Sequence, residues 1–188
     1  MPGAPSDAQI AEMTRQLSQA RTENWYATDL YTWQWFFLIA LFILPWVAFH
    51  CLAHRRKLPR LILFGLILMF VTMGLDLLGY ELGRWYYPYK IAPFGPFVAF
   101  VDHAPFPVIF MLLYQYLSGW GVFAAGVVVT AAVFAFVFEP ALELMGLYMP
   151  LEWEFYYSFP VYILLPLFAR WLTESIFTAA ERDKVGRD

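Results

Sequence analysis

The sequence carries little charge for its length, and this shortage sets the class of protein. Only 14% of its 188 residues are charged, compared with roughly 25% in an average globular domain. Hydrophobic residues make up 61% of the chain, which is more apolar surface than a water-soluble core of this size can bury. The lipid bilayer is therefore the expected solvent and partner. The net charge of −3 leaves no strongly basic surface, so nucleic acid is excluded as a partner.

Cysteine is nearly absent as well. Cys51 is the single cysteine, which excludes an internal disulfide framework and a metal site built from several cysteines. Because Cys51 stands at the end of an apolar run, we expect it to be a small buried residue.

The first 31 residues are predicted to form an N-terminal tail that contains an amphipathic helix. Residues 1–24 are polar and lack the apolar core of a cleavable signal peptide. Ile10, Met13 and Leu17 recur at helical spacing on one face, and Asp7 is the expected cap.

Long apolar runs fill the rest of the chain. They predict an all-α membrane protein with five transmembrane helices in a compact bundle. Each run has close to the ~20 apolar residues that a spanning helix needs, and the alternating pattern of a β-barrel is absent. The expected spans are residues 33–52, 61–80, 97–117, 122–142 and 158–177. The transmembrane domain is thus expected over residues 32–178, followed by a cytoplasmic tail at 179–188.

Lysine and arginine are unevenly distributed over the expected loops. The loop at 54–60 contains four of them, and so does the region from residue 170 onward. The N-terminal tail and the loop at 83–96 contain two each. Because cytoplasmic loops are enriched in these residues, the N-terminus is expected outside and the C-terminus in the cytoplasm.

Ionisable side chains gather at one end of the expected bundle, which is the outer leaflet in this topology. Asp76 lies near the outer end of the second span, and Glu139 near that of the fourth. A charge at the centre of a bilayer costs roughly 2.5–3.5 kcal/mol, so these side chains should face the bundle and find partners there. The expected pocket residues are Asp76, Arg84, Asp102, His103, Tyr114, Gln115, Glu139 and Glu143.

The fourth span supports an inward-facing pocket. A stripe of mostly small residues recurs there at intervals of three and four and ends in two carboxylates, which predicts the buried face. Its members are Gly121, Ala125, Val128, Ala132, Ala135, Glu139, Glu143 and Gly146.

Prolines stand beside the ionisable groups of two spans. Pro105 and Pro107 follow His103 in "FVDHAPFP" (residues 100–107), and Pro140 follows Glu139. Each proline deprives a carbonyl one turn earlier of its helical donor, and such carbonyls are tolerated where they line protein or water. We therefore expect a kinked, polar helix entrance that faces an outward cavity.

The polar cluster allows a chemical and a structural interpretation. Its carboxylates and imidazole suit zinc, manganese or iron, or an acid–base pair. The candidate metal ligands are Asp76, Asp102, His103 and Glu139. None of them has the spacing of a recognised metal or nucleophile motif. A purely structural network is the equal alternative, with Arg84 paired to Asp102 and Lys90 paired to Glu139. The cofactor is therefore left open.

The aromatic side chains of the two outer loops also allow two interpretations. A membrane-interface belt is favoured over a ligand cage, because Trp and Tyr are enriched where bilayers meet water. The residues concerned are Trp85, Tyr86, Tyr87, Tyr89, Trp153, Tyr156 and Tyr157.

Several stretches of the C-terminal half resemble an uncharacterised family of small multi-pass membrane proteins of spore-forming bacteria. They are "DHAPFPVIFMLLYQY" (102–116), "FVFEPALELMGLY" (136–148), the tryptophan at 153 and "YYSFPVYI" (156–163). The resemblance implies a bacterial cytoplasmic (inner) membrane protein with four or five helices and no assigned activity. The basic loop at 54–60 and the long N-terminal tail depart from the family pattern.

The sequence favours a small non-catalytic membrane protein. It would be a sensor, an accessory subunit of other membrane proteins, or a module that binds a lipid or small molecule in a polar pocket near the outer leaflet. The alternative is a membrane-embedded enzyme, metal-assisted or not, that acts on a lipid or isoprenoid, so whether the chain is an enzyme stays open. An ion or proton carrier ranks last, because the inner halves of the spans have few polar residues.

Overall fold

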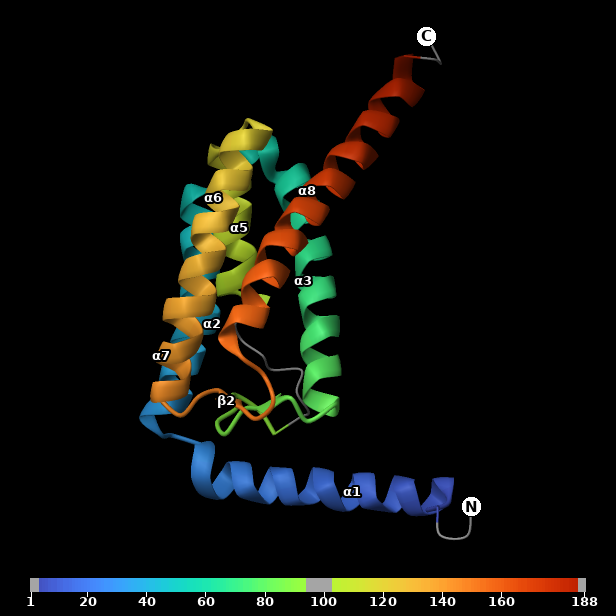
Figure 1. The fold of residues 1–188 in the computed structure, drawn as a ribbon, viewed down its shortest axis with the longest axis vertical. Coiled ribbons are helices and arrows are strands. Elements are labelled where there is room, and N and C mark those ends of the chain that lie inside the picture. Colours follow the sequence, from blue (N-terminus) through green and yellow to red (C-terminus); the bar gives the residue numbers. More distant parts are fainter. Residues whose placement is uncertain (1–3, 94–102, 186–188) are drawn as a thin grey trace.

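The chain folds into a bundle of helices that carries a short two-stranded sheet at one end (Figure 1). The computed structural model describes residues 4–93 and 103–185. The α-helices are α1 (Asp7–Asn24), α2 (Trp33–Leu52), α3 (Leu58–Glu81), α5 (Pro105–Tyr116), α6 (Trp120–Val133), α7 (Glu139–Leu144) and α8 (Phe155–Val185). Shorter turns are η1 (Trp25–Asp29), η2 (Arg55–Lys57) and η3 (Phe134–Phe138), and the strands are β1 (Trp85–Tyr86) and β2 (Met149–Pro150).

Four helical segments of the described part are long and apolar enough to cross a membrane. They are Trp33–Leu52, Arg55–Glu81, Trp120–Leu144 and Phe155–Arg182. The predicted third span differs, because α5 has only 12 residues and reaches about 18 Å where the hydrocarbon core is about 30 Å thick. Residues 94–102, which include the start of that span and Asp102, lie outside the described residues. The described part therefore shows four such segments and one short apolar helix rather than five equal spans.

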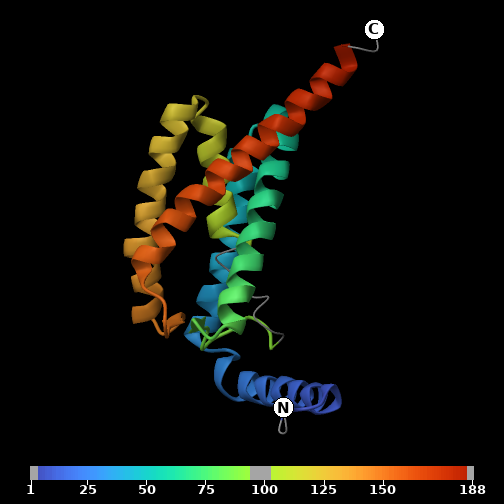
Figure 2. The same cartoon turned by 45° about the vertical axis from the view of Figure 1, so that its right-hand side comes forward.

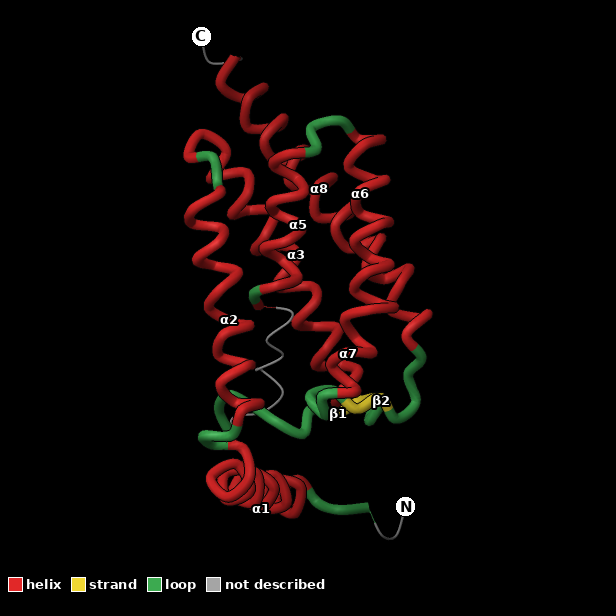
Figure 3. The backbone as a smooth tube through the Cα atoms, turned by 90° about the vertical axis from the view of Figure 1, so that its left-hand side faces the viewer, coloured by secondary structure: helices red, strands yellow, loops and turns green. Residues whose placement is uncertain are grey.

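The short helix α5 lies inside the bundle. It packs against α2, α3 and α6, while α8 packs against α3 and α6. Figures 1 and 2 show α8 crossing the bundle obliquely, with its last turns extending past the other helices. Figure 3 shows the two termini at opposite ends. We name the end that holds the paired strands β1 and β2 the hairpin end, although no short turn joins these two strands. The other end, which holds η2 and the turn at 117–119, is the η2 end.

Two prolines of "FVDHAPFP", Pro105 and Pro107, lie in the first turn of α5. Pro105 is the first residue of α5, where a helix leaves its N–H groups without internal acceptors, so a missing N–H costs nothing. Ala104, just before it, is non-helical, with φ −138° and ψ −76°. The predicted kink also involves residues 94–102, which lie outside the described residues, so it stays a prediction.

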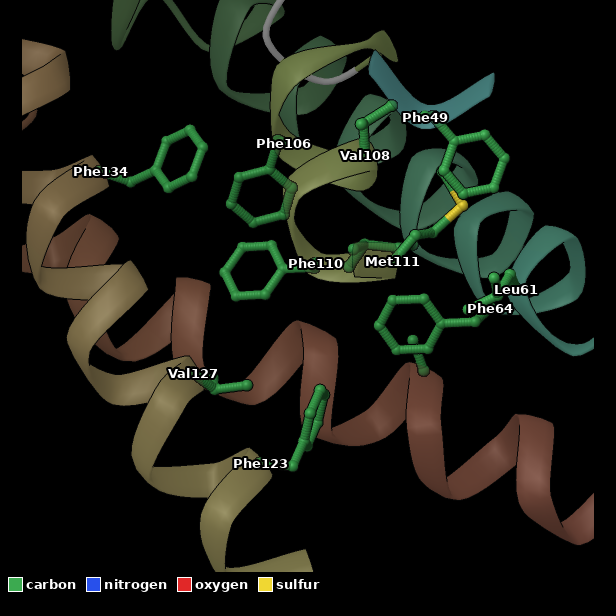
Figure 4. Close-up of a cluster of buried hydrophobic side chains, with 12 residues drawn as sticks. Phe49, Leu61, Phe64, Phe106, Val108, Phe110, Met111, Phe123, Val127 and Phe134 are labelled. Carbon is green, nitrogen blue, oxygen red and sulfur yellow. The ribbon is translucent and has the colours of Figure 1, made fainter. Parts of the chain in front are cut away.

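Phenylalanine rings from α2, α3, α5, α6 and η3 form the centre of the core (Figure 4). Phe106 and Phe110 of α5 point toward Phe134, and the ring centroids of Phe106 and Phe134 are 5.2 Å apart. Met111 points to the opposite side of α5, where Gly65 of α3 leaves room for its sulfur atom. Close packing of this kind is the main attraction between helices in lipid, where little water is displaced.

The buried face of α6 differs from the predicted stripe in its first half. Gly121, Ala125 and Val128 are exposed, whereas Ala135 and Glu139 are buried as predicted. The reason is η3, a five-residue π-helical turn that separates two registers of the same helix. Before this turn, the buried positions are Phe123, Val127 and Ala131.

The N-terminal tail forms the expected helix, but Ser6 and not Asp7 is its cap. The Ser6 hydroxyl accepts from the Gln9 backbone N–H at 3.3 Å, and the Gln9 side chain accepts from the Ser6 N–H at 2.8 Å. No residue of α1 is buried, so an apolar face turned onto the protein is not observed. The Arg21 guanidinium donates to the Tyr80 hydroxyl at 3.0 Å and ties the end of α1 to α3.

A buried aspartate joins the tail to the bundle. Asp29 is 1% exposed and accepts from the Lys90 backbone N–H at 3.0 Å. Trp25 and Trp35 donate their indole N–H groups to the carbonyls of Lys90 and Ile91. Burial lowers the pKa of the Lys90 ammonium, and the nearby Asp29 carboxylate opposes that shift.

Cys51 is exposed, so the expectation of a buried thiol is wrong. Only Phe49 in this last turn of α2 is buried, while His50 and Leu52 are exposed too. The position at the end of an apolar run therefore says nothing about which side of the helix faces the core.

Candidate functional site

The hairpin end ties together the loops that follow α3 and α7. Trp85 pairs with Pro150 and Tyr86 with Met149 in the antiparallel sheet. The Arg84 carbonyl accepts backbone N–H groups from residues 151 and 152, and the Arg84 guanidinium binds the Glu152 carboxylate at 2.6 Å. Two segments that are far apart in the sequence therefore form one lid over the helix ends.

A cavity of about 270 Å³ lies beneath this lid. Its walls come from α3, η3, α7, α8 and the two loops. The polar and charged lining residues are Thr72, Asp76, Arg84, Glu139 and Ser158, and the Trp and Tyr residues of the lining are Trp85, Tyr87, Tyr148, Trp153 and Tyr162. The remaining lining is apolar, which is the usual composition of a small-molecule site.

Asp76 reaches the cavity from α3. Its Oδ1 atom accepts a hydrogen bond from the Trp85 indole N–H at 2.9 Å and another from the Tyr87 hydroxyl. Gly79, one turn later on α3, makes this possible, because a Cβ at that position would overlap the Trp85 ring. The glycine therefore allows the indole to lie flat against the helix and to reach Asp76.

Glu139 reaches the same cavity from the opposite wall. It is 7% exposed, and its Oε2 atom accepts from the Ser158 hydroxyl at 3.0 Å, while the Tyr162 hydroxyl donates to Oε1. The Trp153 indole N–H donates in turn to the Ser158 hydroxyl at 2.9 Å. Ser158 and Tyr162 stand four residues apart on α8, so they share one face of that helix.

Neither carboxylate forms an ion pair with a lysine or arginine among the described residues, although the His103 imidazole lies close enough to attract the Asp76 carboxylate. Arg84, the expected counter-ion, instead pairs with Glu152, and Lys90 lies beside Asp29 and not beside Glu139. The other ion pairs of the described part are Glu12–Arg15, Arg60–Glu181 and Arg170–Glu174. The expected pairing of Lys90 with Glu139 is therefore wrong, and both cavity carboxylates accept from neutral donors.

The other predicted residues near this end lie beside the cavity and do not line it. The His103 Nε2 atom is 2.9 Å from the Met73 sulfur, and the ring is within electrostatic range of Asp76. Glu143 lies one turn beyond Glu139 and is absent from the lining. Asp102 lies outside the described residues, and so does its predicted pairing with Arg84.

Tyr114 and Gln115 lie at the η2 end and not in the cavity. The Gln115 side chain accepts from the His54 backbone N–H at 2.7 Å and donates to the Leu52 carbonyl at 2.9 Å. It thus satisfies the hydrogen-bonding capacity of two backbone groups at the end of α2. The Tyr114 ring stacks on Phe64, with centroids 4.9 Å apart. Both have structural roles, so grouping them with the outer pocket is wrong.

The aromatic residues of the two loops at the hairpin end differ in their positions. The Trp85 and Trp153 rings meet edge to face at the cavity, with centroids 5.0 Å apart, and Tyr87 also lines it. Tyr86 and Tyr156 are exposed, as in the predicted membrane-interface belt. Three of the seven residues therefore line the cavity, while the membrane-interface belt stays a prediction.

No group of three or more metal-ligand side chains is found within residues 4–93 and 103–185. Asp76, His103 and Glu139 therefore do not form a metal site by themselves, and the fourth candidate, Asp102, is outside this range. The described geometry is that of a mostly apolar cavity with two carboxylates.

The sequence-based prediction missed two groups that matter for these contacts. Ser158 and Tyr162 donate hydrogen bonds to Glu139. Their four-residue spacing places both on one face of α8, and this pattern could have identified them. Arg170 was counted as a charge at the membrane surface, but it is 3% exposed and binds Glu174 four residues later.

Comparisons with family models, with curated proteins and with solved structures found no match to this chain. The assignment of function therefore depends on the geometry of the cavity.

Proposed function

We propose that this protein is a small membrane-embedded module that binds a lipid or another small amphiphilic molecule in the cavity at the hairpin end. The carrying observation is that two helices bring Asp76 and Glu139 to one mostly apolar cavity, where neither pairs with a lysine or arginine of the described residues. A carboxylate in an apolar membrane site is expensive and is typical of a functional position.

Occupancy of the cavity tests this proposal. Val161 lines the cavity, so Val161→Trp should fill it, whereas Val129→Trp places the same ring on an exposed face of α6. Both variants and the wild type would be purified in a non-ionic detergent, incubated with a bacterial lipid extract and examined by native mass spectrometry. We expect a bound compound in the wild type and in Val129→Trp, and its loss in Val161→Trp. Equal retention in all three proteins would overturn the proposal.

An enzyme that acts on a lipid or isoprenoid is the second candidate. Two carboxylates at one cavity are the groups that acid–base chemistry on such a substrate needs. Turnover of the same lipid extract by the wild type, and its loss in Glu139→Gln, would favour this candidate. Binding without turnover favours the non-catalytic module.

We propose that the hairpin end faces the outside of a bacterial inner membrane. The η2 end holds Arg55, Arg56, Lys57 and Arg60, and cytoplasmic ends are enriched in such residues. Because Cys51 is exposed, labelling would start from Cys51→Ser. In that background, an impermeant thiol reagent added from outside should modify Ser6→Cys and spare Lys57→Cys. The reverse pattern would place the cavity at the cytoplasmic leaflet.

We also propose that α1 lies on the membrane surface. It is oriented across the long axis of the bundle in Figure 1, and it exposes Ile10, Met13 and Leu17. These residues recur along one face, as in helices that lie in the bilayer interface. Spin labels at Met13 and Arg15, in separate variants, should show oxygen accessibility at position 13 and water accessibility at 15. Equal values would contradict this placement.

A further inference from the structure

The cavity has the chemistry of a site for an organic cation. We propose that its ligand carries an ammonium group on an apolar body. This inference rests on the proposed ligand-binding function and adds the chemical class of the ligand. Three features carry it, namely unbalanced negative charge, aromatic walls and an apolar floor.

The charge of this region is strongly one-sided. Residues 72–102 and 134–160 contain seven Asp and Glu but only two Lys and Arg. The two cations are Arg84, which pairs with Glu152, and Lys90, which lies beside Asp29. Residues 94–102, which lie outside the described part, contain no Lys, Arg or His. His103 is the one titratable nitrogen near Asp76 in the described part, and its Nε2 atom contacts Met73.

The two carboxylates stand in a low-dielectric site without full compensation. Asp76 and Glu139 accept hydrogen bonds only from the neutral hydroxyl and indole groups described above. Neutral donors stabilise a carboxylate less than a charged partner does. A bound cation would therefore gain attraction from both walls of the cavity, and an anion would be repelled by both.

The aromatic walls favour an organic cation over a metal ion. Trp85 and Trp153 meet at the cavity, and Tyr87 and Tyr148 line it with ring centroids 5.8 Å apart. Ring faces attract ammonium groups, and indole is the strongest of them. Metal ions instead prefer three or more direct ligands, which the described residues do not assemble.

The apolar part of the lining indicates the chemistry of the rest of the ligand. Leu75, Leu142 and Leu165 also line the cavity. A fully hydrated inorganic cation would leave these side chains facing water, whereas an apolar body attached to the ammonium group would cover them. The ligand is therefore an amphiphile with a positive head.

Calorimetric titration in dodecyl maltoside tests the sign of the ligand charge. The probes are benzyltrimethylammonium chloride and sodium benzenesulfonate, which carry a similar ring with opposite charges. We expect saturable binding of the cation and none of the anion. Asp76→Asn and Glu139→Gln should each weaken cation binding at least tenfold. Glu143→Gln is the matched control on the same helix and should change it less than twofold.

Two results would overturn the inference. One is equal binding of the cation and the anion, and the other is cation binding that neither carboxylate variant weakens. Either result leaves the ligand-binding function intact as long as Val161→Trp still removes a bound compound. Loss of that difference between Val161→Trp and Val129→Trp would instead remove the proposed function itself.

A competition experiment identifies the source of the ammonium group. Phosphatidylethanolamine carries it on a lipid, and phosphatidylglycerol is the control without it. If phosphatidylethanolamine displaces benzyltrimethylammonium and phosphatidylglycerol does not, the ligand is an amine-bearing lipid. If neither lipid displaces the probe, the ligand is a free amphiphilic amine.

Discussion

The two ends of the bundle handle buried polar groups in opposite ways. At the η2 end, the Arg170 guanidinium is buried beside Glu174 and donates to the carbonyls of residues 117–119. It also lies over the rings of Tyr114, Trp120 and Phe123. At the hairpin end, Asp76 and Glu139 receive only neutral donors. The η2 end thus pairs its buried guanidinium with a carboxylate, whereas the two cavity carboxylates have no lysine or arginine partner among the described residues.

This difference separates a structural polar network from a candidate binding site. A buried ion pair with all its hydrogen bonds satisfied fixes the helices around it and needs nothing further. A pair of carboxylates in an apolar cavity needs a proton, water or a ligand to complete it. The same residue types therefore have different meanings at the two ends.

The largest predicted loss of stability is at the η2 end. Arg170→Ala should destabilise the protein by about 3–5 kcal/mol, because three carbonyls lose their guanidinium donor and Glu174 is left with the Trp120 indole N–H. Arg182→Ala removes an exposed charge from the same helix and should change the stability by less than ~0.5 kcal/mol. Thermal unfolding in detergent measures both variants. Similar melting temperatures would show that the Arg170 network does not stabilise the η2 end.

A smaller effect is predicted at the cavity. Gly79→Ala should cost about 1–3 kcal/mol, because the added methyl group overlaps the Trp85 ring and drives it away from Asp76. Gly74→Ala is the control in the same helix, where no atom lies within 4 Å of the new Cβ. Gly74→Ala should leave the free energy of unfolding unchanged or raise it by about 0.5–1 kcal/mol. Tryptophan fluorescence should change in Gly79→Ala only, and an unchanged spectrum would contradict this packing.

The smallest effects are predicted for the exposed ion pairs, which occur at both ends. Arg84→Gln breaks the pair with Glu152, and Arg60→Gln breaks the pair with Glu181. Each should cost about 0–1 kcal/mol, since both partners of both pairs are well exposed. When unfolding is measured in low salt and in 1 M NaCl, the loss of stability should be smaller at the higher salt concentration. A large, salt-independent loss in Arg84→Gln alone would mean that Arg84 supports the cavity.

The helical class and the gathering of acids could be predicted from composition and position. Long apolar runs can only be helices or barrels in lipid, and the period of the runs excluded barrels. Asp76 and Glu139 were placed together because carboxylates near one end of a bundle avoid lipid. The cavity does bring these two side chains to one space.

The errors have physical causes as well. Gln115 was grouped with His103 because both belong to the same predicted span. However, 12 residues of helix cover about 18 Å, so residues of one helix can lie at opposite ends of the bundle. The small-residue stripe failed before residue 134 because no composition rule reveals a π-helical turn. Trp85 reached the cavity through the space beside Gly79, which is a contact between loop and helix that periodicity cannot show.

The π-helical turn also bears on how the length of this chain can vary. A turn of this kind holds one more residue than an α-helical turn, so η3 contains a residue that the helix can lose. Removing the exposed Val137 would turn η3 into an ordinary turn and keep Phe134 and Glu139 on their present sides. Removing Val129, which is equally exposed, would rotate everything after it by about 100° and carry Glu139 out of the cavity. Shorter versions of this protein are therefore expected to lose a residue within η3 and not within α6.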